Sequence, residues 1–308
     1  MTVPTFPSVP SVPSVPTVPT TAPAASGASL DRLRDELRAL GRVVVAFSGG
    51  ADSAFLAKVA TDTLGRDAVL CATAISPSLA VAEEADCRAL VAEWDLRWVG
   101  VPTGEIHDPV YVANGADRCA RCKTALMEAL GPLAAAEGAG AGAGATVVLG
   151  VNVDDLGDHR PGQAAAAEQG AQFPLVAAGF TKDDVRAWSR RLGLRTWDKP
   201  AAACLASRLP YGTPVTLGRL AAVDAAEAAL RALGLGGRLR VRHHGDAARL
   251  EVEPEALAAV VARRQEVVAV VRAAGFTFVA LDLEGFRSGS LNRVLAPADA
   301  ADAKAERP

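Results

Sequence analysis

The chain has 308 residues, of which 50% are hydrophobic and 22% charged, with a formal net charge of -3 and an isoelectric point near 5.9. This length suits one large or two medium domains, and no apolar run reaches the roughly 18 to 20 residues of a membrane-spanning helix. The mild negative charge argues against a surface that tracks nucleic acid throughout. Five cysteines, an odd number, do not indicate a secreted disulfide scaffold, so we expect a reducing cytoplasm.

The first 26 residues form a proline-rich leader without a charged residue, in which six prolines recur at every third position from Pro4 to Pro19. Such a segment favours polyproline II and cannot bury a core, so we expect it to be disordered. It lacks the basic start and continuous apolar stretch of a signal peptide, and a proline-motif docking tail is the alternative hypothesis. Residues 297–308 are expected to be a frayed tail.

From residue 27 onward, apolar periodicity predicts alternating helices and strands. The β-branched run at residues 42–47 is typical of a strand buried on both faces. This alternation predicts an α/β fold with a doubly wound parallel sheet over residues 27–200. The expected strands cover residues 42–47, 68–74 and 146–152, and the expected helices cover residues 30–40, 54–64, 79–94 and 123–137.

After residue 200 the pattern changes to that of a second, smaller α+β domain, which we place at residues 201–296. A short link between two strand-like runs, residues 238–244 and 248–253, predicts a hairpin. Helices are expected at residues 217–233 and 254–272, and a last strand at residues 276–283.

The segment Ser48-Gly49-Gly50-Ala51-Asp52-Ser53 stands between the first expected strand and a helix. Its glycines permit a tight turn and a close approach to an anion, and the helix start adds unpaired N–H groups. The two serines can add hydroxyl donors, so the segment suits a phosphate group. It has neither the GxxxxGK[ST] of a Walker loop nor the GxGxxG of a dinucleotide fold, and an ordinary strand-to-helix turn is the alternative interpretation.

The pattern SGGxDS also resembles the PP-loop of the ATP pyrophosphatase superfamily, whose members cut ATP between the α and β phosphates and adenylate a substrate. The resemblance implies that Asp52 helps to hold Mg²⁺ against the pyrophosphate. Gly150, Asn152 and Asp155, at the end of another expected strand, should converge on the same crevice. Ala74, which ends the second expected strand, is included in this predicted ATP site.

Three cysteines stand in motif-like surroundings, Cys119 and Cys122 in RCARCK and Cys204 in KPAAACLASRLPYGTP. A lone CxxC fits a zinc half-site, a redox pair or coincidence. Three thiolates suit a [4Fe-4S] cluster with one open iron, whereas structural zinc needs a fourth ligand such as His107 or His159.

The other two cysteines and two of the lysines are interpreted from their surroundings. Cys71 lies inside an expected strand and Cys87 on a helix face, so both are expected to be buried and inert. Only five lysines occur in the chain, so Lys123 and Lys199, which stand at motif positions, are more suggestive than lysines usually are.

A more specific resemblance covers nearly all of residues 30–291. It rests on six blocks in this order: VAFSGGADS, RCARCK, GVNVDDLGDHRPG, WDKPAAACLASRLPYGTP, RVRHHGDAARLEVE and DLEGFRSGSLN. Together they resemble the LarE-type ATP-dependent sulfur transferases, which mature the nickel-pincer nucleotide cofactor used by lactate racemase.

The resemblance implies that ATP adenylates the carboxylates of pyridinium-3,5-biscarboxylic acid mononucleotide, releasing pyrophosphate, and that sulfur delivery makes thiocarboxylates. Cys204 occupies the position of a sacrificial cysteine that gives up its own sulfur. The presence of Cys119 and Cys122 departs from that pattern and resembles a three-cysteine variant, in which a [4Fe-4S] cluster carries the sulfur. We favour the cluster route, with these three catalytic cysteines as its ligands and with ATP, Mg²⁺ and the cluster as cofactors.

Basic residues are the expected contacts for the phosphate and carboxylates of the substrate. Arg208 closely follows the third motif cysteine, and Arg160 lies in the DHRPG segment. Arg240, Arg242 and His244 alternate along one expected strand and so share a face, for which a merely exposed basic strand is the alternative.

Three other functions were weighed. A tRNA thiolase shares the PP-loop, the cysteines and the adenylate, but it should show a broad basic surface and usually further zinc-binding cysteine pairs. Amidation of the GMP-synthetase or NAD-synthetase type would not explain the cysteines, and a non-catalytic ATP sensor would release no pyrophosphate. We therefore expect a small pyridinium nucleotide as the partner, no membrane or nucleic acid, a homo-oligomer by resemblance, and a sulfide donor that the sequence does not identify.

Overall fold

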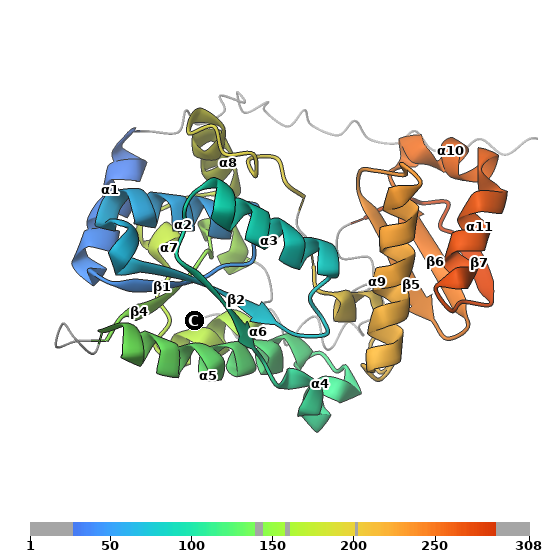
Figure 1. The fold of residues 1–308 in the computed structure, drawn as a ribbon, viewed down its shortest axis with the longest axis horizontal. Coiled ribbons are helices and arrows are strands. Elements are labelled where there is room, and N and C mark those ends of the chain that lie inside the picture. Colours follow the sequence, from blue (N-terminus) through green and yellow to red (C-terminus); the bar gives the residue numbers. More distant parts are fainter. Residues whose placement is uncertain (1–26, 139–143, 158–160, 201–202, 288–308) are drawn as a thin grey trace, which may run out of the picture.

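The structure is a computed structural model that describes residues 27–138, 144–157, 161–200 and 203–287 (Figure 1). The proline-rich leader, the predicted tail and the predicted substrate contact Arg160 lie outside the described residues. Within these ranges, no helix combines the length and the apolar character that crossing a membrane would require.

A four-stranded parallel sheet organises the N-terminal part of the molecule. Its strands are β1 (Val43–Ala46), β2 (Val69–Ile75), β3 (Trp98–Pro102) and β4 (Thr146–Leu149), in the spatial order β3-β2-β1-β4. Val43 of β1 is in register with Val69 on one side and with Thr146 on the other. The predicted α/β class with a parallel sheet is therefore confirmed.

Helices cover both faces of this sheet. Successive residues of β1 point to opposite faces and are apolar, so each face has side chains to bury. Val43 and Val45 pack with α1 and α2, whereas Val44 packs against α5. Figure 1 shows the two helical layers, with α5 and α6 on the opposite side of the sheet from α1 and α2. The helices are α1 (Gly27–Leu40), α2 (Ala51–Leu64), α3 (Val81–Glu93), α4 (Pro109–Ala113), α5 (Arg118–Gly138), α6 (Pro161–Glu168), α7 (Pro174–Ala177) and α8 (Lys182–Arg191).

The strand order creates a switch point between β1 and β4. The chain runs from β1 through β2 to β3 in one direction and then returns to place β4 on the other side of β1. In open parallel sheets, ligands bind in the crevice outside the carboxyl ends of the two strands at such a point. The residues that follow β1 and β4 are therefore the first place to look for a site.

A second, three-stranded sheet forms the C-terminal part, with β5 (Leu239–His244) antiparallel to β6 (Ala247–Val252) and β7 (Phe278–Leu281) parallel to β6. Helices α9 (Leu217–Ala232), α10 (Leu257–Ala262) and α11 (Arg264–Ala273) accompany it. The predicted hairpin is confirmed. The boundary near residue 200 stays a prediction, because the apolar cluster under this sheet also includes Tyr111 from α4.

Several elements differ from the sequence predictions. Helices α4, α6, α7 and α8 were not predicted, and three further differences concern β3, α5 and the last helices. Strand β3 was not predicted, since it is a half-buried edge strand that contains Gly100 and ends at Pro102. Helix α5 begins at Arg118 rather than at residue 123, which places the CxxC pair in its first turns. The single helix expected at residues 254–272 is a short 3₁₀ turn followed by α10 and α11, which meet at Arg263.

Candidate active site

A glycine-serine turn follows β1 and leads into α2 at the switch point. Gly49 has a φ of +67°, a conformation that glycine adopts without strain, and Gly50 precedes the first residue of α2. The hydroxyl of Ser53 accepts a hydrogen bond from the Ser48 N–H (3.2 Å) and lies 3.0 Å from the Ser48 hydroxyl. This turn and the start of α2 form a cradle suited to an anion, which we call the phosphate cradle.

Gly150, which follows β4, allows the side chain of Asn152 to approach the phosphate cradle. A Cβ atom at this position would lie 2.8 Å from the backbone nitrogen of Ser53 and 2.9 Å from the carbonyl carbon of Asp52, so only glycine fits. The close approach lets the Asn152 amide donate a hydrogen bond of 3.1 Å to the Asp52 carboxylate. The structure thus brings together Gly150, Asn152 and Asp52, as the sequence predicted.

Asp52 is the carboxylate most suited to a metal ion beside the phosphate cradle. Burial raises its pKa, the hydrogen bond from Asn152 lowers it, and the charge of Asp155 raises it further. Asp155 is buried and forms an ion pair of 2.9 Å with Lys182 of α8. A partly buried carboxylate of this kind fits Mg²⁺, which prefers hard oxygen ligands. Ala74 lies near the end of β2, and its place in the ATP site stays a prediction.

Lys199 connects this cradle to the segment that carries Cys204. Its ammonium donates hydrogen bonds to the Gly49 carbonyl (3.0 Å) and to Asp86 of α3 (2.6 Å), and it forms an ion pair with Glu83 of α3 (2.8 Å). Burial lowers the pKa of Lys199, but these carboxylates outweigh burial and raise it, so the side chain stays charged.

The three motif cysteines lie near one another in the fold. Cys119 and Cys122 occupy the first turns of α5, where the helix dipole favours thiolates. Cys204 precedes a 3₁₀ turn at Leu205–Arg208, and both it and Cys119 are exposed. Burial raises the pKa of Cys122 to about 12, and the charges of Cys204 and Cys119 add to that effect. All three thiols are free.

Asn114 and Arg118 hold the two cysteine-bearing segments together. Asn114 is fully buried at a φ of +58°, and its amide donates to the carbonyls of Pro210 (2.8 Å) and Thr213 (2.9 Å). Arg118 donates to the Asn114 side-chain oxygen (2.6 Å) and to the Ala206 carbonyl (2.9 Å). We call this pair the clasp. The sequence analysis missed it.

The Arg118 guanidinium also supplies positive charge to the cysteines. It is buried, one of its nitrogens lies 3.8 Å from the Cys119 sulfur, and no carboxylate pairs with it among the described residues. Burial lowers the pKa of Arg118, but the charges of Cys204 and Cys119 outweigh it and raise the pKa. A buried arginine without a carboxylate favours an anion beside it, which a thiolate provides.

Tyr111 and Ser78 attach the Cys204 segment to the parallel sheet. The two hydroxyls share a short hydrogen bond, and the Leu205 N–H donates to the Ser78 carbonyl (2.8 Å). Burial raises the pKa of Tyr111 well above its usual range, helped by the negative charges of Cys204 and Cys122. Both residues were absent from the predicted site.

Cys119, Cys122 and Cys204 are candidate ligands for a metal ion or an iron–sulfur cluster. No group of three His, Cys, Asp or Glu side chains in the described ranges is arranged around a single metal ion. Cys119, Cys122 and Cys204 are nonetheless free, close enough to influence one another electrostatically, and accompanied by Arg118. Three thiolates are the donor type of a [4Fe-4S] cluster with one open iron, whereas structural zinc needs a fourth ligand, so the cluster stays a prediction from the cysteines themselves.

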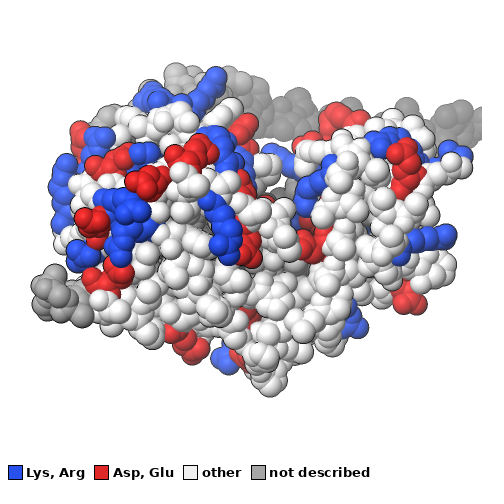
Figure 2. All heavy atoms as spheres, in the orientation of Figure 1, with Lys and Arg blue, Asp and Glu red and all other residues white. Residues whose placement is uncertain are grey.

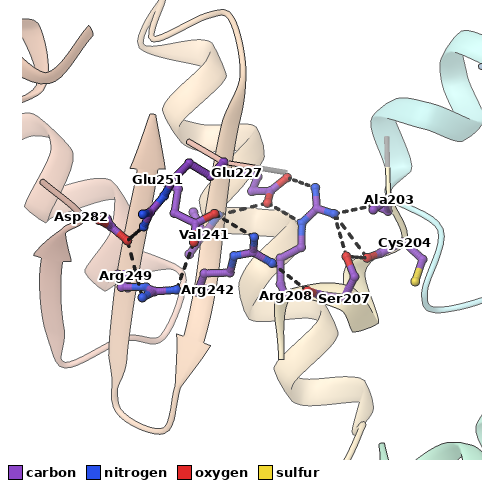
Figure 3. A network of polar contacts seen from close by, with 11 residues as sticks. Ala203, Cys204, Ser207, Arg208, Glu227, Val241, Arg242, Arg249, Glu251 and Asp282 are labelled. Carbon is purple, nitrogen blue, oxygen red and sulfur yellow. Dashed lines mark hydrogen bonds and ion pairs between the residues drawn. The ribbon is translucent and has the colours of Figure 1, made fainter. Parts of the chain in front are cut away.

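A buried ionic network fixes the turn after Cys204 to the second sheet (Figure 3). Arg208 donates to Glu227 of α9 at 2.9 and 3.2 Å, and to the backbone carbonyls of Ala203 and Cys204 (3.3 Å). Figure 3 shows the sulfur of Cys204 pointing away from Arg208. Arg208, a predicted substrate contact, is thus occupied by protein groups.

The guanidinium of Arg242 is also bonded to other groups of the protein. It forms an ion pair of 2.8 Å with the fully buried Glu251, which also pairs with Arg249 (3.0 Å), and it donates to the Ser207 carbonyl (2.8 Å). The alternative of an exposed basic strand is wrong for this residue, because the strand face is covered.

Arg240 differs from its two arginine neighbours. Burial lowers its pKa to about 10, and the charges of Arg208 and Arg242 lower it as well. Its guanidinium lies 4.4 Å from the centre of the Phe286 ring, and it has no carboxylate partner within the described ranges. Among the predicted arginine contacts that the structure describes, Arg240 thus differs from Arg208 and Arg242 in forming no ion pair with a carboxylate, and its contact with a substrate stays a prediction. His244, at the end of the same strand, is exposed, and partial desolvation of its ring together with the charges of Arg249 and Arg242 lowers its pKa.

The remaining cysteines behave as the sequence predicted. Cys71 and Cys87 are fully buried, and burial raises their pKa values to about 12 and about 11. A Cβ atom on Gly49 would lie 2.7 Å from the Cys87 sulfur, so this thiol packs directly beneath the phosphate cradle. Asp158 and His159 lie outside the described residues.

The surface shown in Figure 2 carries lysines and arginines interspersed with aspartates and glutamates rather than one broad basic patch. This face therefore lacks the extended positive surface that a nucleic-acid substrate favours.

A parallel α/β sheet with a glycine-serine cradle at its switch point defines a PP-loop-like fold. No family model matches the chain. It is 38% identical over 265 residues to the pyridinium-3,5-bisthiocarboxylic acid mononucleotide synthase of Lactiplantibacillus plantarum, covering 86% of this chain and 94% of the relative. The protein therefore belongs to the LarE-type sulfur transferase family.

Two further relatives extend over most of the chain. An uncharacterized protein of Synechocystis sp. is 44% identical over 275 residues, which cover 87% of this chain and 98% of the relative. An uncharacterized protein of Methanocaldococcus jannaschii is 24% identical over 247 residues, which cover 80% of this chain and 91% of the relative.

Proposed function

We propose that the protein is an ATP-dependent sulfur transferase that converts the carboxylates of pyridinium-3,5-biscarboxylic acid mononucleotide into thiocarboxylates for the nickel-pincer cofactor. The 38% identical relative, a pyridinium-3,5-bisthiocarboxylic acid mononucleotide synthase, supports this product. The observation that carries the proposal is the hydrogen bond between Lys199 and Gly49, which joins the phosphate cradle to the segment that bears Cys204. Activation by ATP and attack by sulfur can therefore take place in one chain.

The chemistry needs two steps. A substrate carboxylate oxygen attacks the α phosphorus of ATP, the bond to the β phosphate breaks, and pyrophosphate leaves. A sulfur nucleophile then attacks the acyl carbon, and AMP leaves with the oxygen, giving a thiocarboxylate. The adenylate is required because a carboxylate is otherwise a poor acceptor for a nucleophile.

The phosphate cradle is the proposed ATP site. Ser48, Gly49, Gly50 and Ser53 would bind pyrophosphate oxygens through backbone N–H groups and hydroxyls, supported by the positive end of α2. Asp52 would hold Mg²⁺, with Asn152 fixing the orientation of its carboxylate. Ala74, Gly150 and Asp155 complete the set.

Cys119, Cys122 and Cys204 are the proposed ligands of a [4Fe-4S] cluster. Such a group, with one iron free of protein ligands, supplies a place from which sulfide can be passed on over many turnovers. Arg118 would balance negative charge there, while the clasp holds the two cysteine segments together. The competing proposal is that Cys204 donates its own sulfur and is consumed.

Arg240 is the proposed anchor for the phosphate or a carboxylate of the substrate, because it is buried and forms no ion pair with a carboxylate in the described ranges, although Glu251 and Glu227 act on its charge from further away. His244 lies on the same strand and could add a contact. Arg208 and Arg242 would act mainly by fixing the Cys204 turn and by adding to the positive potential around Arg240. Arg160 keeps its proposed role from the sequence alone.

The test is pyrophosphate release with purified, iron-reconstituted protein under anaerobic conditions. We expect release that depends on the biscarboxylate nucleotide, and thiocarboxylate product by mass spectrometry. Arg240→Gln should raise the KM for this substrate, whereas Arg238→Gln, at an exposed arginine just before β5, should not. Pyrophosphate release that instead depends on tRNA would show a tRNA thiolase, and no release with any carboxylate would show a nucleotide sensor.

A further inference from the structure

Lys199 stands where three parts of the molecule meet. Its ammonium touches the phosphate cradle at the Gly49 carbonyl and α3 at Glu83 and Asp86, and its backbone lies five positions before Cys204. Its side chain is 17% exposed. The ammonium is therefore largely removed from water, and these three contacts take the place of hydration.

Lys199 contacts the phosphate cradle at Gly49, where the backbone conformation is most constrained. Gly49 is held at positive φ, and its Cα packs against Cys87 so closely that no side chain would fit. A cation on the Gly49 carbonyl fixes the orientation of the following peptide group, whose N–H belongs to Gly50 and lines the cradle. Lys199 therefore stabilises the arrangement that an incoming phosphate needs.

Arg195, four residues before Lys199, also contacts α3 and serves as a comparison for Lys199. Arg195 pairs with Asp86 (2.6 Å) and with Glu93 (2.8 Å), so it joins the same segment to the same helix. None of its hydrogen bonds or ion pairs reaches the phosphate cradle. The two cations thus share one carboxylate, but only Lys199 reaches Gly49.

We infer that Lys199 is a positioning residue that couples the nucleotide site to Cys204. It shapes the phosphate cradle through Gly49 and also holds α3, and just before α3 the Ser78 carbonyl accepts a hydrogen bond from the N–H of Leu205, so occupancy of the cradle is transmitted to the neighbouring Cys204. This inference rests on the proposed function, since it takes ATP as the ligand of the cradle.

The experiment uses the full chain and α,β-methylene-ATP, an analogue that cannot be cut between the α and β phosphates. Calorimetry should show that Lys199→Met weakens binding of the analogue about tenfold, while Arg195→Gln stays within about twofold of the wild type. Lys199→Arg, which keeps the charge, should recover most of the affinity. If Lys199→Met does not fold, Lys199→Gln keeps a polar hydrogen-bond donor without the charge and should still lose at least about threefold.

Hydrogen-deuterium exchange of residues 203–209 tests the coupling itself. The analogue should slow exchange there in the wild type and in Arg195→Gln, but not in Lys199→Met. The inference is overturned if Lys199→Met binds as the wild type does, or if Arg195→Gln loses as much as Lys199→Met. Failure of the proposed function appears elsewhere, as a wild-type chain that does not bind the analogue at all.

Discussion

Glu227 of α9 holds Arg208 by two hydrogen bonds of 2.9 and 3.2 Å, and Arg208 in turn holds the backbone carbonyl of Cys204. Both charged side chains are almost completely buried. The backbone at Cys204 is thus fixed in place by a helix that is itself bonded to the second sheet, because Glu227 also accepts a hydrogen bond from the Val241 N–H of β5.

Glu227→Gln should destabilise the fold by about 3 kcal/mol, because it leaves the buried Arg208 without a countercharge. Thermal or urea unfolding at pH 7 measures this. Glu266→Gln, at an exposed pair with Arg263, is the matched control and should cause no clear change. A Glu227→Gln protein as stable as the control would contradict the importance of the pair.

The same pair predicts a pH dependence. Burial would raise the pKa of Glu227, but the hydrogen bonds and charge of Arg208 outweigh it and hold the pKa below its ordinary value of 4.5. A depressed carboxyl pKa gives stability that is present above pH 4.5 and is lost as the pH falls through the folded-state pKa. The stability gap between wild type and Glu227→Gln should therefore be constant near neutral pH and shrink below pH 4.5.

Asn114→Ala should destabilise the protein by about 2 to 3 kcal/mol, because it removes hydrogen bonds to Pro210 and Thr213 and leaves Arg118 with the Ala206 carbonyl but without its side-chain acceptor. Asn114→Gly removes the same bonds but relieves the positive φ, so it should be less destabilised, by about 1 kcal/mol. Urea unfolding compares the two. Equal losses would show that the backbone conformation contributes nothing.

Gly150→Ala should cost about 1 to 3 kcal/mol and weaken ATP binding, since the new methyl group would overlap the backbone of Asp52 and Ser53. Gly131→Ala is the control, because Gly131 lies in α5 with open space around its Cα and alanine favours a helix. We expect the control to be slightly more stable than the wild type. An unchanged ATP affinity in Gly150→Ala would contradict the close packing of the two strand ends.

Asp52→Asn should separate stability from binding. Burial raises the Asp52 pKa, so the charged carboxylate costs stability at neutral pH in the nucleotide-free protein, and its removal should raise the Tm. The same change should weaken Mg²⁺-dependent ATP binding by about tenfold or more, because a hard oxygen ligand is lost. Calorimetry with and without Mg²⁺ checks the second effect, and a wild-type Mg²⁺ dependence would exclude Asp52 as a metal ligand.

The phosphate cradle could be predicted because all of its parts are local in sequence. Ser48, Gly49 and Gly50 follow a strand with an unmistakable β-branched run, and Gly150 and Asn152 follow the neighbouring strand. Parallel strands bring their carboxyl ends to one edge, so position along the chain was enough to place these residues together.

The clasp and the buried ionic network could not be predicted, because they join residues far apart in the sequence. Asn114 binds carbonyls almost a hundred positions away, and backbone acceptors leave no mark on the sequence. The arginines of β5 were predicted to share a face, but nothing local showed that Glu251 would bury Arg242 while Arg240 has no carboxylate partner in the described ranges. Lys199 stood out only as a lysine at a motif position in an arginine-rich chain.

The central claim, sulfur transfer through three cysteines, is tested most directly by the intact mass of the protein after turnover. Iron-reconstituted protein would be incubated anaerobically with ATP, the biscarboxylate nucleotide and sulfide, beside Cys119→Ala and Cys204→Ala. The account predicts more than one sulfur transferred per chain, an unchanged wild-type mass, and loss of product in both variants. At most one sulfur per chain, with Cys204 lighter by the mass of H₂S and Cys119→Ala fully active, would contradict it.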